Sequence, residues 1–131
     1  MKLKTLIEAN EPLKRLTDKR FASYKKMREL VKLRKALEQE IDFYAAEEKK
    51  AVNVYAETDD KGTPLFLPDG RLRLRDAEAK VAFETEIEAL LNTEIDGISP
   101  VTLTEKDFLS SEDLPTASDM IALEAIIEFE D

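Results

Sequence analysis

The feature that most constrains this chain is a stretch of about 37 residues, from Phe21 to Glu57, without proline or glycine. Its apolar residues recur mostly at steps of three or four, which is typical of an amphipathic α-helix. At about 1.5 Å per residue, such a helix would span about 55 Å. The apolar stripe comprises Met27, Leu30, Leu37, Ile41, Tyr44, Val52 and Tyr55, and is widened by Val31, Leu33 and Ala45.

The segment that follows carries turn and strand signals. TDDKG at residues 58–62 ends the helix, and PDG at 68–70 is typical of a tight turn, because proline presets φ and glycine accepts a positive φ. TPLFL before this turn and RLRLR after it favour two short strands. We therefore expect a two-stranded β-ribbon at residues 63–75.

Signals for three further helices flank these elements. Thr5 and Glu8 fit a capping box for a short helix that ends near residue 18. Asp76 is a good N-cap for a helix that runs from Ala77 to about Asn92. A turn, a short extended segment and one helical turn follow over residues 96–108. A last helix then opens at residues 115–116, with the apolar residues Met120, Ile121, Leu123, Ile126 and Ile127.

Helix lengths predict how these elements combine. The helix after Asp76 is about 24 Å long, so it can return along the long helix only to about Tyr44 or Ile41. The first half of the long helix, residues 21–40, needs other partners, since most helix stability comes from packing an apolar face. We expect an α+β, mainly α, single domain over residues 1–131. In this domain the N-terminal segment (1–20) and the C-terminal helix (within 96–131) form a base, and residues 21–95 form an antiparallel helical hairpin with the ribbon at its tip.

The charges are distributed unevenly. The net charge is −9, yet residues 14–35 carry ten Lys or Arg against two acidic groups, and residues 112–131 carry seven Asp or Glu and no basic group. Such a split indicates either a nucleic-acid or membrane patch, or two regions that face each other in one chain or between copies. No run of about 18 apolar residues is present, which argues against a membrane partner.

Residue types exclude several chemistries. The chain has no cysteine and no histidine, so the best nucleophile and the usual general base are absent. It has no calcium-loop pattern, and its three glycines form no phosphate-binding motif. We expect no enzyme, no cofactor and no metal. The start of the chain lacks the apolar region of a signal peptide, so we expect a cytoplasmic location.

Two groups of basic residues are candidate interaction sites. The first is Arg71, Arg73 and Arg75 on one face of the ribbon, where pairing with nearby carboxylates is the alternative to a binding edge. The second lies in the basic stretch 19–35, where phosphate binding by the cations with stacking on Tyr24 is the alternative to neutralisation by the acidic C-terminal segment. Its members are Lys25, Arg28, Lys32 and Lys35.

Several phrases resemble a known group of sequences. They are YKKMRELVKLRKALEQEID, the turn-rich DDKG and PDGRLRL, EIEALLNTEID, and the pair LTEKDF and ALEAIIEFED near the end. Together they resemble the small uncharacterised proteins of phages and prophages of Gram-positive bacteria. The resemblance implies a phage-encoded origin in a host bacterium, with no enzymatic role.

These observations favour one class of function and leave a second open. We expect a non-enzymatic protein-interaction or assembly accessory protein, whose partner is another copy or a phage or host protein and which is located in the host cytoplasm or on a virion. The alternative is a nucleic-acid or host-factor binding module that uses the basic stretch 19–35.

Overall fold

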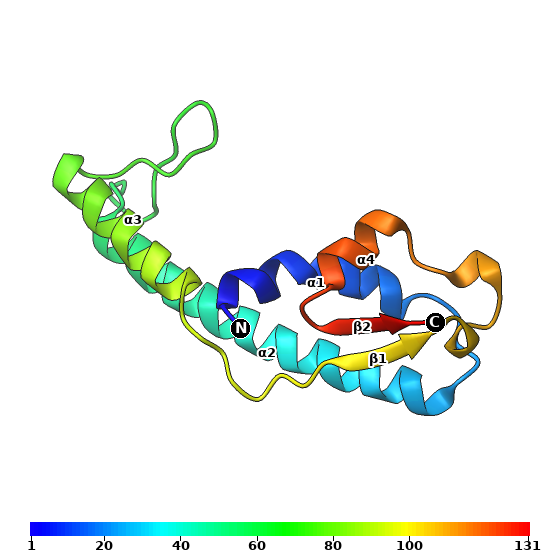
Figure 1. The fold of residues 1–131 in the computed structure, drawn as a ribbon. Coiled ribbons are helices and arrows are strands. Elements are labelled where there is room, and N and C mark those ends of the chain that lie inside the picture. Colours follow the sequence, from blue (N-terminus) through cyan, green and yellow to red (C-terminus); the bar gives the residue numbers. More distant parts are fainter. The chain divides into compact units, whose positions relative to one another are not determined.

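The computed structural model describes residues 1–131 and shows a mainly helical chain with one small sheet, which confirms the expected α+β, mainly α class (Figure 1). The chain forms two compact units: a terminal unit of Met1–Ile41 with Glu94–Asp131, and a central unit of Asp42–Thr93. The elements are α1 (Leu3–Thr17), α2 (Tyr24–Tyr55), α3 (Ala77–Leu91), β1 (Val101–Thr104), the 3₁₀ turns Glu105–Asp107 and Ser111–Asp113, α4 (Ala117–Leu123) and β2 (Ile127–Glu130).

The terminal unit contains the hydrophobic core of the protein. The core combines side chains of α1, the first half of α2, β1, α4 and β2, so both ends of the chain supply the partners that residues 21–40 were expected to need. Met27 is an exception to the predicted stripe, because 38 % of it remains exposed. The nine large side chains that are fully buried are Leu6, Leu13, Leu16, Leu30, Leu37, Leu103, Leu123, Ile126 and Ile127.

The expected C-terminal helix is wrong in its second half. Helix α4 ends at Leu123, and β2 pairs in parallel with β1, with Val101 opposite Ile127 and Leu103 opposite Phe129. The segment IEFE alternates apolar and acidic residues, so in a strand Ile127 is buried while Glu128 faces solvent. The strand therefore separates apolar from charged side chains, which a continued helix would not do as cleanly.

The expected start of the first helix is also wrong. Helix α1 begins at Leu3, with Lys2 before it and no side-chain cap. Lys2 forms an antiparallel bridge with Glu94, which brings the start of the chain beside the segment that follows α3. Thr5 therefore lies inside the first turn of the helix and not at its N-cap.

The central unit contains the second half of α2, helix α3 and the segment between them. Asp76 caps α3 as predicted, since its Oδ1 accepts a hydrogen bond from the Ala79 amide at 2.7 Å. The unit begins at Asp42, whereas the expected helical hairpin began at residue 21. The difference arises because Leu30, Leu33 and Leu37 of α2 are buried in the core of the terminal unit.

At the tip between α2 and α3 the two arms of the expected ribbon pair across the turn, with Phe66 opposite Leu72, but they form isolated bridges and not strands, and a third segment joins them. The Glu57 amide donates to the Arg73 carbonyl, the Arg73 amide to the Leu65 carbonyl, and the Leu65 amide to the Glu57 carbonyl, each at 2.9 Å. These three hydrogen bonds form a closed ring. The residues just after α2 thus pair with both arms of the ribbon, which leaves no unpaired edge at these three positions.

No helix of the protein combines the length and the apolar character that crossing a membrane requires.

Candidate protein-interaction site

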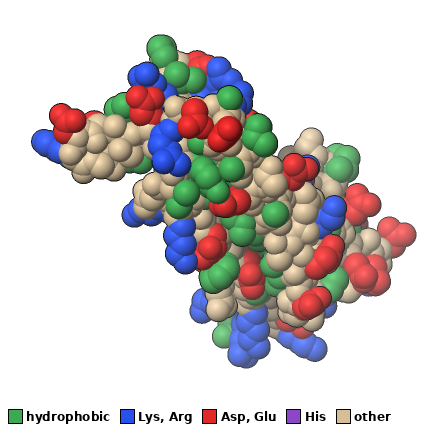
Figure 2. Space-filling view, turned by 90° about the vertical axis from the view of Figure 1, so that its left-hand side faces the viewer, with side chains coloured by type: hydrophobic (Ala, Val, Ile, Leu, Met, Phe, Trp, Pro, Cys, Tyr) green, Lys and Arg blue, Asp and Glu red, His purple; other side chains and the backbone are tan.

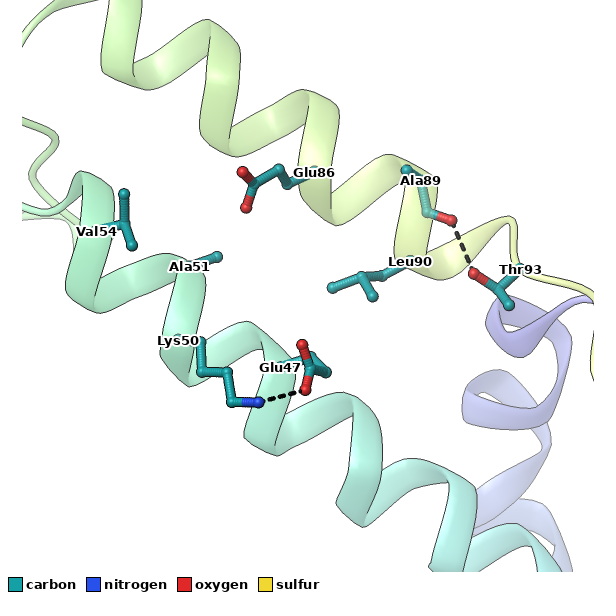
Figure 3. Close-up of a pocket in the computed structure, with 8 residues that line it drawn as sticks. All are labelled: Glu47, Lys50, Ala51, Val54, Glu86, Ala89, Leu90 and Thr93. Atoms are coloured by element: carbon teal, nitrogen blue, oxygen red, sulfur yellow. Dashed lines mark hydrogen bonds and ion pairs between the residues drawn. The ribbon is translucent and has the colours of Figure 1, made fainter.

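A groove of about 350 Å³ lies between α2 and α3 in the central unit (Figure 3). Its floor is apolar, and Leu90 points from α3 toward α2. Glu47 lies on one wall, where its Oε1 pairs with the Lys50 ammonium at 2.8 Å, and Glu86 lies on the other. The lining residues are Glu47, Lys50, Ala51, Val54, Glu86, Ala89, Leu90 and Thr93.

This groove exists because the central unit does not close over its own apolar side chains. Ala51, Ala56 and Ala79 are its only buried residues, and all the large side chains of the unit stay at least partly exposed. Val54 on the groove wall is 55 % exposed. On the face that Figure 2 presents, apolar side chains reach the surface in small groups between charges of both signs.

One residue near the end of α2 joins the two helices above the groove. The Tyr55 hydroxyl donates to Glu86 Oε1 at 2.6 Å, and the Tyr55 ring meets the Phe83 ring edge-on with centroids 6.4 Å apart. The hydrogen bond to the carboxylate raises the pKa of Tyr55. Phe83 and Glu86 lie near the middle of α3, so Tyr55 connects the end of α2 to the middle of α3.

A second tyrosine interacts with a carboxylate along α2. The Tyr44 hydroxyl donates to Glu48 Oε2 at 2.8 Å. Burial, followed by this hydrogen bond, raises the pKa of Tyr44 to about 12. Glu48, which interrupts the apolar stripe, therefore has a local partner one turn earlier on the same helix.

The ribbon arginines have local partners. Arg71 Nε lies 2.7 Å from Asp69 Oδ2 within the turn, and Arg73 Nε lies 2.8 Å from Glu57 Oε2. The Arg75 amide donates to the Tyr55 carbonyl at 3.1 Å, and its side chain forms no ion pair. Two of the three guanidinium groups are thus held by carboxylates of the tip, as in the alternative that the sequence left open.

The basic residues of α2 lie along an exposed face of the terminal unit. Lys25, Lys32 and Lys35 form no ion pair, and the Arg28 guanidinium carbon lies 5.9 Å from the centre of the Tyr24 ring. Tyr24 is 68 % exposed and Val31 is 41 % exposed. The face is therefore both basic and apolar.

The acidic C-terminal segment contacts α1 and the loop after it, and no salt bridge joins it to the basic face of α2. Arg15 Nη2 lies 2.7 Å from Asp119 Oδ1, and the Arg20 amide donates to Asp113 Oδ1 at 3.2 Å. The latter hydrogen bond, from the backbone of Arg20, lowers the pKa of Asp113. The expected pairing of the two charged regions thus occurs through Arg15, before the basic stretch 19–35, and through the backbone of Arg20.

The groove was not among the sites expected from the sequence. Leu90 shares a helical spacing with Phe83 and Ile87, a pattern that is typical of helix packing, and Val54 lies outside the predicted stripe of α2. The available signal was the position of Val54 beside Ala51 and Tyr55, where an apolar residue widens the stripe. Elsewhere in the chain, no three Asp or Glu side chains come together as a metal-binding group.

Comparison with known proteins gives no relative: no family model matches the chain, and neither the curated proteins nor the solved structures contain a significant match.

Proposed function

We propose that this chain is a non-enzymatic protein-interaction protein that binds a partner through the groove between α2 and α3. One observation carries the proposal: the central unit leaves all its large apolar side chains at least partly exposed, whereas the terminal unit fully buries nine. An exposed apolar groove between charged walls is typical of protein–protein contacts. A partner helix that bound in this groove would remove the side chains of Val54 and Leu90 from water.

Site-specific photo-cross-linking tests this function. A photoreactive amino acid at Val54 is expected to attach to a protein, either another copy or a different chain, when the purified protein is irradiated alone or in an extract of its cells. The same group at Val81 is the matched control, since Val81 is a 65 % exposed apolar residue of α3 that does not line the groove. Equal or absent protein adducts at the two positions would contradict the proposal.

The resemblance to phage and prophage proteins supports a more specific setting, in which the partner belongs to an assembling phage particle or to the host. Neighbouring genes test this part separately. Tail or capsid genes beside the coding sequence would favour an assembly accessory role. Genes of an early region would instead favour binding to a host protein.

Nucleic-acid binding by residues 19–35 is the second candidate, and the unpaired ammonium groups of Lys25, Lys32 and Lys35 favour it. A salt-dependent gel shift with DNA or RNA that disappears in Lys25→Glu with Lys32→Glu would support it. The exposed Met27 and Val31 in the same face argue for a protein partner, because phosphate groups gain nothing from apolar side chains.

A further inference from the structure

We propose that the occupant of the groove is the basic face of α2 in a second copy of this chain; this inference rests on the function proposed above. The basic face is defined here as the apolar residues Tyr24, Met27 and Val31 with the four cations around them, Lys25, Arg28, Lys32 and Lys35. The contact joins two different surfaces of identical chains, because each copy has one groove and one basic face.

Both surfaces present apolar side chains along about two turns of helix. Tyr24, Met27 and Val31 follow one another at steps of three and four, so they form a stripe of two helical turns, about 10 Å long. The α2 wall of the groove spans seven steps from Glu47 to Val54, also about 10 Å, and its apolar residues are Ala51 and Val54. The stripe of Tyr24, Met27 and Val31 is exposed in the single chain, as is Val54 in the groove, and docking would remove these side chains from water.

The charges of the two surfaces are complementary. The four cations of the basic face form no ion pair, whereas Lys26, beside them, pairs with Glu29 at 3.5 Å. The helical part of the central unit, Asp42–Tyr55 with α3, carries seven Asp or Glu against three Lys. The groove itself is lined by Glu47 and Glu86 against Lys50, so two grooves facing each other would bring an excess of negative charge together, and a basic helix is the better occupant.

The contact is expected to be weak and sensitive to salt. Two helical turns bury an area at the small end of protein interfaces. The charges lie at the rim, where ions screen them, so added salt weakens the association. Because the two surfaces differ, the contact is heterologous, and repeated contacts give rings or open chains of copies.

Two single variants and their mixture test the proposal. Val31→Glu alters the basic face and leaves the groove intact, and Val54→Lys alters the groove and leaves the basic face intact. Ile121→Glu and Val81→Lys are matched controls, since both residues are exposed and lie outside the two surfaces. Self-association is measured by light scattering and sedimentation at increasing concentration, in low and high salt.

The expected result has three parts. The unaltered protein and the controls self-associate more weakly as salt rises. Each variant alone associates at least about tenfold more weakly, as for a central contact residue. An equimolar mixture of the two variants recovers association as a dimer, because one intact face meets one intact groove. This recovery also shows that both variants keep their fold.

Other results overturn the proposal and separate it from the proposed function. A protein that stays monomeric at high concentration excludes a second copy, and an adduct from Val54 to a different protein then leaves the proposed function standing. If Val54→Lys abolishes self-association and Val31→Glu leaves it intact, the grooves of two copies pair with each other. Loss of a gel shift in Val31→Glu with Lys32→Glu, with self-association unchanged, assigns the basic face to nucleic acid.

Discussion

Arg15 in α1 and Asp119 in α4, 104 positions apart in the chain, form a bidentate ion pair. Arg15 Nη2 lies 2.7 Å from Asp119 Oδ1, and Arg15 Nε lies 3.1 Å from Asp119 Oδ2. Hydrogen bonds from the guanidinium lower the pKa of the Asp119 carboxyl, although partial burial opposes this effect. The pair ties the first helix of the terminal unit to the last one.

The first prediction concerns the acid stability of this ion pair. Because the pKa of Asp119 is lower in the folded than in the unfolded chain, its stabilisation is present above the ordinary aspartate pKa and is lost as pH falls through the lowered value. Asp119→Asn is therefore expected to lower the midpoint of urea unfolding at neutral pH, and the difference from the unaltered protein should vanish in strong acid. Glu124→Gln, which changes an exposed acidic residue of the same segment, is the control. A difference that persists unchanged into acid would show that the ion pair is not its source.

The second prediction compares the cores of the two units. Leu30 is fully buried in the terminal unit, so Leu30→Ala is expected to cost about 2–5 kcal/mol of unfolding free energy. Ile87 of α3 is only partly buried, so Ile87→Ala loses less apolar area and should cost clearly less. Urea unfolding of dilute protein measures both. Amide hydrogen exchange should also be faster in α3 than in α1, because few buried contacts hold α3. Equal costs and equal protection would contradict this difference.

Local signals explain which parts of the fold were predictable. Helix α3 begins where Asp76 predicted it because the cap and the following apolar stripe lie within a few residues of each other. The sheet was missed because β1 and β2 are four residues each and pair across a separation of 26 positions. The sequence of either strand therefore does not indicate the other as its partner. In so short a segment as IIEFE, helical and strand periods are hard to separate.

The candidate site was less predictable than the fold. A periodic pattern shows that Leu90 shares a side of α3 with Phe83 and Ile87, but the pattern does not tell how deeply each is buried. Met27 lay in the predicted stripe and is nonetheless exposed at the edge of the buried face. The third segment of the tip was not predicted, because the residues after Tyr55 are typical of a helix end and a turn.

The third prediction tests the hydrogen-bond ring at the tip. Leu65→Pro removes the amide that donates to Glu57, whereas Leu65→Ala keeps it and removes only side-chain contacts. Amide exchange at Glu57 and Arg73, followed by nuclear magnetic resonance, should become much faster in the proline variant than in the alanine variant. The amides of α1 serve as an internal control. Equal exchange in the two variants would mean that the three hydrogen bonds do not support one another.

The fourth prediction concerns the alkaline titration of Tyr44, whose pKa is raised to about 12 by burial and by its hydrogen bond to Glu48. Because the folded pKa is the higher one, the stabilisation is complete below the ordinary tyrosine pKa and is lost as pH rises through the folded value. Glu48→Gln keeps a hydrogen-bond acceptor and removes the charge. This variant should therefore lower the pKa of Tyr44 without returning it to its ordinary value, since burial remains. Near-ultraviolet absorbance of tyrosinate follows the titration, with Tyr24→Phe and Tyr55→Phe in the background so that only Tyr44 contributes. A full return to the ordinary value would show that Glu48, and not burial, is the main cause.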